Sequence, residues 1–331
     1  MTKGFRATTE HLDSLPIVVL ADDRGQRARI ALHGAALLSL ELPFAAGVFN
    51  VAPGYKSAVE ILARQGSYFA ILAPFGGRIR EARYRFDGVP HDLDPAAANG
   101  VRGFRHGFVR DADFDLAELV ADSQSARTVL HTRIAPQLGY PFCIDLNLEF
   151  VLDANGLSLS AHMHNAGDTA APCFFGWHAY FRMGEGLLDD WSLTIPAHST
   201  MRTGDDLIAV PGQAAYAALD QNPALDFRQP QTIGARQLDN SYVGLKQAND
   251  GLLYTRLANP ATGVGIEVWQ ERGVMHAFTG DTLGERARMA LALEPMECMA
   301  DAFNRPEWLQ AIRLEPGATR TFRCGVRRAR A

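Results

Sequence analysis

The chain has 331 residues, of which 47% are hydrophobic and 21% charged, the composition of an ordinary soluble globular protein with a sizeable core. Its net charge of -5 argues against a general nucleic-acid-binding protein. No segment approaches the roughly 18 consecutive apolar residues of a membrane helix, so we expect no membrane partner.

Strand patterns begin near the N-terminus. We expect a first strand at residues 15–21, followed by two apolar stretches within residues 29–40 that lie on either side of a glycine. Residues 83–90 alternate between apolar and polar side chains and turn at an Asp-Gly pair, which is a hairpin signal.

A second hairpin has the clearest pattern in the chain. Residues 143–152 alternate almost strictly, residues 153–156 form a turn signal, and residues 157–164 alternate again. This pattern predicts two paired strands with one buried face. Strand patterns return at residues 265–270 and 320–326.

Helical signals are few. Residues 111–118 and 304–310 each allow a turn or two. Many strands without alternating helices predict an all-β fold, a large antiparallel β-sandwich with few short helices. Because no repeat, linker or break in composition interrupts the chain, we expect residues 1–331 to form a single domain.

Residues 291–304 hold the most informative feature of the sequence. Small and apolar residues lead directly to Glu294, and a proline follows, as at the end of a buried strand. A carboxylate there is costly unless it is paired, hydrogen-bonded or used, and its surroundings would tune its pKa as a general base requires. On position alone, a structural Glu that pairs or caps at a strand end is the ordinary interpretation.

Glycine-rich and aromatic segments supply further candidates. Arg78 follows two glycines, but the spacing fits neither a dinucleotide-binding loop nor a P-loop, and a surface ion pair is the simpler alternative. His106 precedes a glycine, which would let a ligand approach closely, or it is an ordinary loop histidine. His178 lies in the aromatic residues 174–181, whose rings suit a sugar face and a protein core equally well.

Other polar residues give weaker signals. His162 and His164 share one face of a strand by their spacing. A metal needs further ligands that have no evident local source, so we expect no metal site. Asp239 stands just before an aromatic strand, where a turn-capping aspartate is the alternative interpretation. A catalytic serine is not expected, because the GxSxG motif is missing.

Taken in order, these segments resemble the aldose 1-epimerase (galactose mutarotase) family. The similarity begins at residues 33–40 and ends at residues 314–319, and the family fold is a large antiparallel β-sandwich. The resemblance implies a substrate-binding arginine at Arg78, a sugar-pocket histidine at His106, a general acid at His178, a hydroxyl-binding aspartate at Asp239 and a general base at Glu294.

Departures from the family pattern bear on the substrate. Gly77 stands where the family has Asn, Phe108 replaces a glycine, and Trp177 replaces the residue before His178. We interpret Trp177 as a substrate-binding residue and expect the aromatic segment to offer an apolar sugar face. Bulk at Phe108 and Trp177 should narrow the pocket and favour a free monosaccharide.

The resemblance implies acid–base chemistry that needs no cofactor and no metal. Glu294 would take the proton of the anomeric hydroxyl while His178 protonates the ring oxygen, so the expected function is interconversion of the α and β anomers of a free monosaccharide. A hexose-6-phosphate 1-epimerase is an alternative that would need a cationic cluster. The arginines available for it are Arg80, Arg83, Arg102, Arg105 and Arg110. A catalytically inactive carbohydrate-binding or regulatory protein is the other alternative.

The cysteines and the N-terminal residues bear on location. Cys143, Cys173, Cys298 and Cys324 lie far apart without CxxC spacing, so we expect free thiols. Charged residues flank the short apolar run at 15–21, which makes a poor signal peptide. We therefore expect a cytoplasmic monomer or homodimer whose partner is a small sugar.

Overall fold

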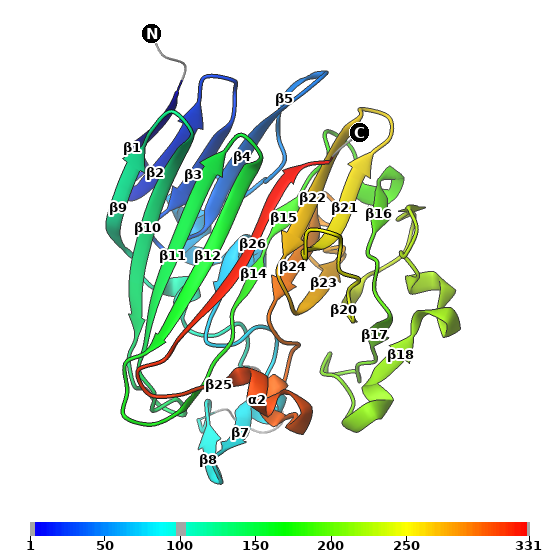
Figure 1. Ribbon diagram of the computed structural model, residues 1–331. Helices are drawn as coiled ribbons and strands as arrows, with labels where there is room; N and C mark the ends of the chain where they lie inside the picture. Colours follow the sequence, from blue (N-terminus) through cyan, green and yellow to red (C-terminus); the bar gives the residue numbers. More distant parts are fainter. Residues whose placement is uncertain (1–3, 97–103, 330–331) are drawn as a thin grey trace.

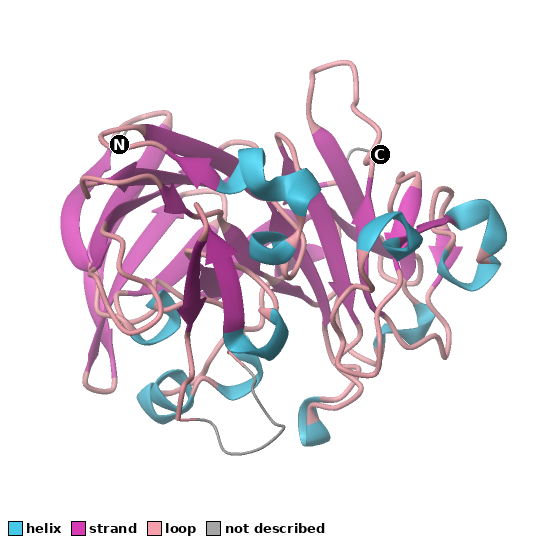
Figure 2. Cartoon of the chain, turned by 90° about the horizontal axis from the view of Figure 1, so that it is seen from below, coloured by secondary structure: helices cyan, strands magenta, loops and turns pink. Residues whose placement is uncertain are grey.

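The computed structural model describes residues 4–96 and 104–329, and antiparallel strands are its main regular structure (Figure 1). The predicted all-β class with few short helices is confirmed. The two α-helices of the described ranges, α1 (Ala58–Ala63) and α2 (Leu309–Ile312), are short and lie in connections between strands. Figure 2 shows these helices and several single helical turns around the sheets.

The first sheet is a meander of five strands near the N-terminus. Its strands, in spatial order, are β1 (Phe5–Leu12), β2 (Leu15–Asp22), β3 (Arg27–Ala31), β4 (Leu37–Phe44) and β5 (Gly47–Asn50). The expected first strand is therefore β2. Sequence patterning missed β1 because most of its side chains are exposed and polar, and it is defined by pairing with β2 along its whole length.

The largest sheet has nine strands, and Figure 1 shows the C-terminal strand β26 in its middle. The order is β19 (Gln231–Thr232), β16 (Ser192–Thr194), β21 (Leu253–Asn259), β22 (Val264–Gln270), β26 (Thr319–Arg328), β12 (Gly156–Asn165), β11 (Ile144–Asp153), β10 (Ser125–Ile134) and β9 (Asp115–Ala121). The predicted β11–β12 hairpin is confirmed, and alternate side chains of β11 are buried.

The helical interpretation of residues 111–118 is wrong for most of the segment. Only its first residue ends a single helical turn, Val109–Asp111, and residues from Asp115 onward form β9. This strand pairs with β10, and such tertiary pairing overrides weak local preference. The other helical segment, residues 304–310, does contain a helical turn, Pro306–Trp308, and the start of α2.

Small two-stranded sheets complete the fold. The hairpin expected at residues 83–90 forms from β7 (Arg83–Phe86) and β8 (Val89–Asp92). A second pair joins β13 (Ala171–Pro172) to β25 (Arg313–Leu314).

The third large sheet has eight strands and carries the polar residues of interest. Its order is β18 (Tyr216–Ala218), β17 (Ser199–Met201), β20 (Asp239–Val243), β23 (Val274–Phe278), β24 (Leu291–Met296), β14 (Gly176–His178) and β6 (Ala70–Leu72), and β15 (Tyr180–Phe181) also pairs with β24. All six residues of β24 are buried, so the strand before Glu294 is buried as expected and continues for two further residues.

One cluster of buried apolar side chains extends from β2 to β26 and fills the space between the sheets. It includes large rings such as Phe150 and Trp191. All four cysteines are free thiols, three of them buried. None of the helices within the described ranges is long and apolar enough to cross a membrane. The single domain expected for residues 1–331 stays a prediction.

Candidate active site

Four neighbouring strands bring the candidate acid–base residues into one row. His276 of β23 lies opposite Ser241 of β20 on one side and opposite Glu294 of β24 on the other. Strand β14 pairs with β24 through Gly176, and β15 continues the same register, which places His178 opposite Glu294. Side chains at directly opposed positions of adjacent strands lie on the same face. The row is therefore Ser241, His276, Glu294 and His178.

Glu294 and His178 form the centre of the site. The Oε1 atom of Glu294 lies 3.3 Å from Nε2 of His178, and both side chains are buried. Burial raises the pKa of Glu294 to about 7, although the nearby His276 opposes the rise. Burial, together with the charge of His276, lowers the pKa of His178 to about 3. The pair is therefore poised to hold and release a proton near neutral pH.

His106 lies beside this pair on a tightly turned loop. Its ring centroid is 5.3 Å from that of His178. The following Gly107 has φ of 64°, and a Cβ atom there would lie 2.0 Å from the carbonyl oxygen of Ala73. Glycine is thus required for the close approach of this backbone to Ala73, which orients the neighbouring His106. Burial and the charges of His178 and nearby arginines hold the pKa of His106 well below its ordinary value.

Two buried ring nitrogens in this group have no partner within the described residues. They are Nδ1 of His106 and Nδ1 of His178. Buried polar atoms are nearly always hydrogen-bonded in folded proteins. These atoms are therefore available to hydroxyl groups of a bound molecule.

Arg78 and Arg105 reach the same site from neighbouring segments. Their backbones form an isolated antiparallel bridge, and the structure gives neither guanidinium group a hydrogen bond or ion pair with another described side chain. Partial burial and the adjacent charge of Arg78 lower the pKa of Arg105. The site thus contains two neighbouring cations that form no ion pair among the described residues, although the charge of Arg78 acts on Asp239.

Asp239 lines the site and contacts His276, a histidine that the sequence patterns did not indicate. Its Oδ1 atom lies 3.1 Å from Nε2 of His276, whose Nδ1 atom lies 2.9 Å from Oγ of Ser241. Burial would raise the pKa of Asp239, but His276 and Arg78 outweigh burial and the pKa is lowered. The one sequence signal for His276 was a histidine within an apolar strand, which is an ordinary feature.

These side chains line a cavity of about 200 Å³. Of the residues expected to form the site, it contains Glu294, His178, His106, Arg78 and Asp239. The remaining lining residues are Gly77, Arg105, Leu207, Ser241, His276, Phe278, Thr282, Met296 and Ala300. The structure therefore brings five of the six expected residues together.

Trp177 is the expected site residue that the structure leaves outside the cavity. Its side chain is fully buried, and its ring packs against Phe69 and Phe181. Adjacent residues of a strand point to opposite faces, so His178 faces the cavity and Trp177 faces the core. Phe108 also packs elsewhere, against Phe75 and Tyr140. The expected narrowing by Phe108 and Trp177 has no basis in this geometry.

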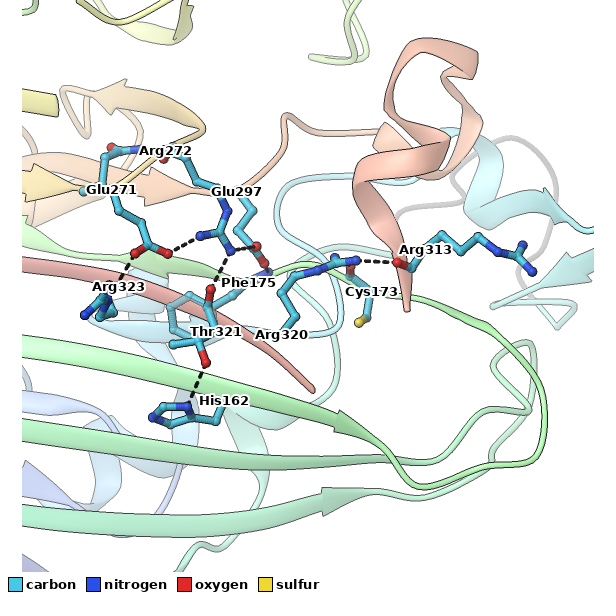
Figure 3. A network of polar contacts seen from close by, with 11 residues as sticks. His162, Cys173, Phe175, Glu271, Arg272, Glu297, Arg313, Arg320, Thr321 and Arg323 are labelled. Atoms are coloured by element: carbon cyan, nitrogen blue, oxygen red, sulfur yellow. Dashed lines mark hydrogen bonds and ion pairs between the residues drawn. The ribbon is translucent and has the colours of Figure 1, made fainter. Parts of the chain in front are cut away.

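A network of polar contacts fixes the strands behind the site (Figure 3). Glu297 accepts a hydrogen bond from the backbone of Phe175 at 2.8 Å, and its own backbone donates to the carbonyl of Phe175 at 2.9 Å. Arg272 donates to Glu297 and to the carbonyl of Thr321, each at 2.6 Å. Because Phe175 precedes β14 and Glu297 follows β24, this network holds together the strands that carry His178 and Glu294.

The histidine pair on β12 makes contacts of a different kind. His162 lies 2.9 Å from the hydroxyl of Thr321, and His164 lies 3.1 Å from that of Thr319. The described residues contain no group of three or more His, Cys, Asp or Glu side chains that could hold a metal ion.

The fold is an antiparallel β-sandwich of the galactose mutarotase-like type. Residues 16–327 match the family described as Aldose 1-epimerase, and the chain belongs to this family. An uncharacterized protein of Escherichia coli, YihR, is 29% identical over 303 residues, which cover 91% of this chain and 89% of that protein.

Solved structures show the same fold at low sequence identity. A galactose mutarotase-like protein from Clostridium acetobutylicum superposes with a TM-score of 0.84 at 12% identity, over 99% of each chain. Galactose 1-epimerase from Lactobacillus acidophilus gives a TM-score of 0.79 at 17% identity, over 99% of this chain and 100% of that chain. The galactose mutarotase-like fold is therefore established for this protein.

Proposed function

We propose that this protein interconverts the α and β anomers of an aldose by acid–base opening and closure of the sugar ring. The observation that carries this proposal is the contact between Glu294, whose pKa is raised to about 7, and His178, at 3.3 Å, in the wall of the cavity. Membership of the aldose 1-epimerase family supports the same reaction. Catalytic groups act best when their pKa lies near the working pH.

The proton balance of the pair fits a reversible reaction. Ring opening needs one group to take the proton of the anomeric hydroxyl and another to give a proton to the ring oxygen, as the bond between that oxygen and C1 breaks. The surroundings of the pair favour a shared proton on Glu294 over His178. Its transfer to His178 makes Glu294 the base and His178 the acid. After rotation about the C1–C2 bond, the two groups exchange roles and the ring closes on the other face.

The other cavity residues would hold the sugar in place for this chemistry. The free Nδ1 atom of His106 and the carboxylate of Asp239 suit sugar hydroxyl groups, which both donate and accept hydrogen bonds. Correct placement of the reacting hydroxyl contributes to the rate in its own right. The volume of about 200 Å³ is below the roughly 300–1,000 Å³ of pockets for drug-sized ligands, which supports a monosaccharide.

A second candidate function is anomerisation of an aldose that carries an anionic group, such as a hexose 6-phosphate. Arg78 and Arg105 favour it, because both line the cavity and neither guanidinium group forms an ion pair with a described residue. Paired guanidinium groups are the usual recognition element for phosphate and carboxylate. This observation weakens the expectation of a free sugar.

The other arginines considered for a phosphate lie elsewhere. Arg80 forms an ion pair with Asp206, and Arg83 forms one with Asp92. Arg110 donates to Ser67 and to a backbone carbonyl. Arg102 lies outside the described residues. Among the described arginines that the sequence offered for binding a phosphate, Arg105 alone lines the cavity.

Polarimetry or exchange NMR on freshly dissolved α-aldoses tests both candidates. We expect the protein to accelerate approach to anomeric equilibrium for at least one aldose, and Glu294→Gln and His178→Asn to lower kcat by roughly 10²-fold or more. Thermal melts show whether each variant is folded. A folded variant of either kind with the wild-type rate would refute the assignment of that residue. Absence of acceleration for every neutral and anionic aldose would leave the alternative of a sugar-binding protein without turnover.

Comparison of substrates separates the two candidates. The sugars are glucose, galactose, xylose, arabinose, fucose and glucose 6-phosphate. A preference of more than about tenfold in kcat/KM for the phosphate, equal to roughly 1.4 kcal/mol of transition-state binding, supports the anionic aldose. A preference of that size for a neutral sugar supports the free monosaccharide.

A further inference from the structure

His276 is a cavity residue to which neither the sequence motifs nor the proposed reaction assigns a role. Both of its ring nitrogens have partners: Nε2 lies 3.1 Å from the carboxylate of Asp239, and Nδ1 lies 2.9 Å from the hydroxyl of Ser241. Its side chain is mostly buried, with 19% exposed. The ring is therefore fixed in one orientation by contacts from a single neighbouring strand, β20.

The other strand beside His276 is β24, which carries Glu294. His276 lies directly opposite Glu294 in the register of β23 with β24, and opposed Cβ atoms in such a pair are roughly 4.5–5.5 Å apart. Glu294 is thus flanked by His276 on one side and by His178 on the other. The two histidines differ in their contacts: His178 lies 3.3 Å from the carboxylate of Glu294, whereas His276 lies 3.1 Å from that of Asp239.

We propose that His276 is a positioning residue of the acid–base site, whose charged imidazolium orients the sugar-binding Asp239 and keeps Glu294 available as a base. The inference rests on the proposed function, because it assumes that Glu294 acts as the base. With both nitrogens protonated, the ring donates one hydrogen bond to Asp239 and one to Ser241. A neutral ring would donate to Asp239 through Nε2 and accept from the Ser241 hydroxyl at Nδ1, so these contacts fix its orientation in either state.

The electrostatics of the cavity agree with this geometry. Burial by itself would lower the pKa of His276, but the carboxylates of Glu294 and Asp239 outweigh burial and raise it. In return, His276 lowers the pKa of both carboxylates relative to burial alone. The titratable and charged groups around His276 are Asp239 from β20, Glu294 from β24, His178 from β14, and His106, Arg78 and Arg105 from the loops. The two carboxylates are the acidic members of this set.

The matched substitution is His276→Gln, which keeps hydrogen-bonding capacity and removes the positive charge. The proposed reaction starts from the pair with one shared proton, so the rate falls as pH rises through the pKa of Glu294, where that proton is lost. Loss of the neighbouring charge should raise this pKa and move the alkaline limb of the kcat/KM profile to higher pH by about one unit or more, the scale for an adjacent charge. Below the limb, the variant should lose about tenfold or more relative to wild type, and above the limb less. The KM should also rise, because Asp239 loses the charge of its partner.

His162→Gln is the control for this substitution. His162 is also a strand histidine in contact with a hydroxyl at 2.9 Å, but it lies on β12 of the nine-stranded sheet. Its substitution should leave the alkaline limb in place. An alkaline limb of His276→Gln within a few tenths of a pH unit of wild type would overturn the role of His276.

Histidine NMR tests the inference without turnover. The ring signals that disappear in His276→Gln identify His276, and we expect them to titrate above the ordinary histidine pKa of about 6.5. A ring that is neutral between pH 5 and 8 would overturn the inference. The failures are distinguishable: an inactive wild type with a charged His276 contradicts the proposed function, whereas an active wild type with a neutral His276 contradicts only the present assignment.

Discussion

Replacement of Glu294 by glutamine should change how the stability of the protein depends on pH. The side chain is 4% exposed, and burial raises its pKa from 4.5 to about 7. Glutamine has nearly the same shape and does not titrate. The difference in unfolding free energy between the two proteins therefore isolates the carboxyl group, because other groups titrate in both.

The sign follows from the raised pKa. Below pH 4.5 the Glu294 carboxyl is protonated in both the folded and the unfolded chain, so its burial as a neutral group does not make the free energy of unfolding depend on pH. As pH rises from 4.5 to about 7, the unfolded chain ionises first and the wild type loses stability. At ~1.4 kcal/mol per unit, the wild type should lose about 3 kcal/mol relative to Glu294→Gln over this window. Above the window, the difference should stay constant.

Urea unfolding at pH 4.5, 5.5, 6.5 and 8 measures this difference. An exposed control is Glu285→Gln, whose unfolding free energy should track that of wild type at every pH. A difference between wild type and Glu294→Gln that does not change from pH 4.5 to 8 would refute the reasoning, because it would mean that the carboxyl group titrates alike in folded and unfolded chains.

Three further outcomes are expected. Arg105→Met should lower kcat/KM for an anionic aldose by about tenfold or more and spare a neutral one, whereas Arg83→Met, outside the cavity, should change neither; equal losses for both sugars would contradict anion recognition. Glu297→Gln should lower the unfolding free energy by roughly 1–3 kcal/mol in urea titration, since it weakens the contacts with Arg272 and Phe175; unchanged stability would contradict this. EDTA should leave the anomerisation rate unchanged, and a loss reversed by zinc would argue for a metal.

The local patterns of the chain were sufficient for several elements of the fold. The β11–β12 and β7–β8 hairpins follow from strict alternation and from turn residues that occur within a few positions of the strands. Strand β1 could not be found in this way, because its exposed side chains carry no apolar pattern. Its pairing with β2 is decided by the chain around it.

The candidate site, too, could be predicted only in part from the sequence. Glu294, His178, His106, Arg78 and Asp239 were expected from segments whose order resembles a known family, and the structure gathers all five around one cavity. Their catalytic and binding roles stay proposals. Trp177 shows where the motif alone misleads, because a residue next to a site residue on a strand faces the opposite side.

The sequence by itself determined the fold class, because alternation is a property of short segments, and its resemblance to a known family indicated the residues that could carry acid–base chemistry. Tertiary structure alone decided which charges face one another. His276 meets Asp239 and Glu294 only through the registers of β20, β23 and β24, and Arg105, unlike Arg80 and Arg83, points into the cavity without an acidic partner among the described residues. The raised pKa of Glu294 arises from burial and neighbouring charge, which exist only once distant strands pack together.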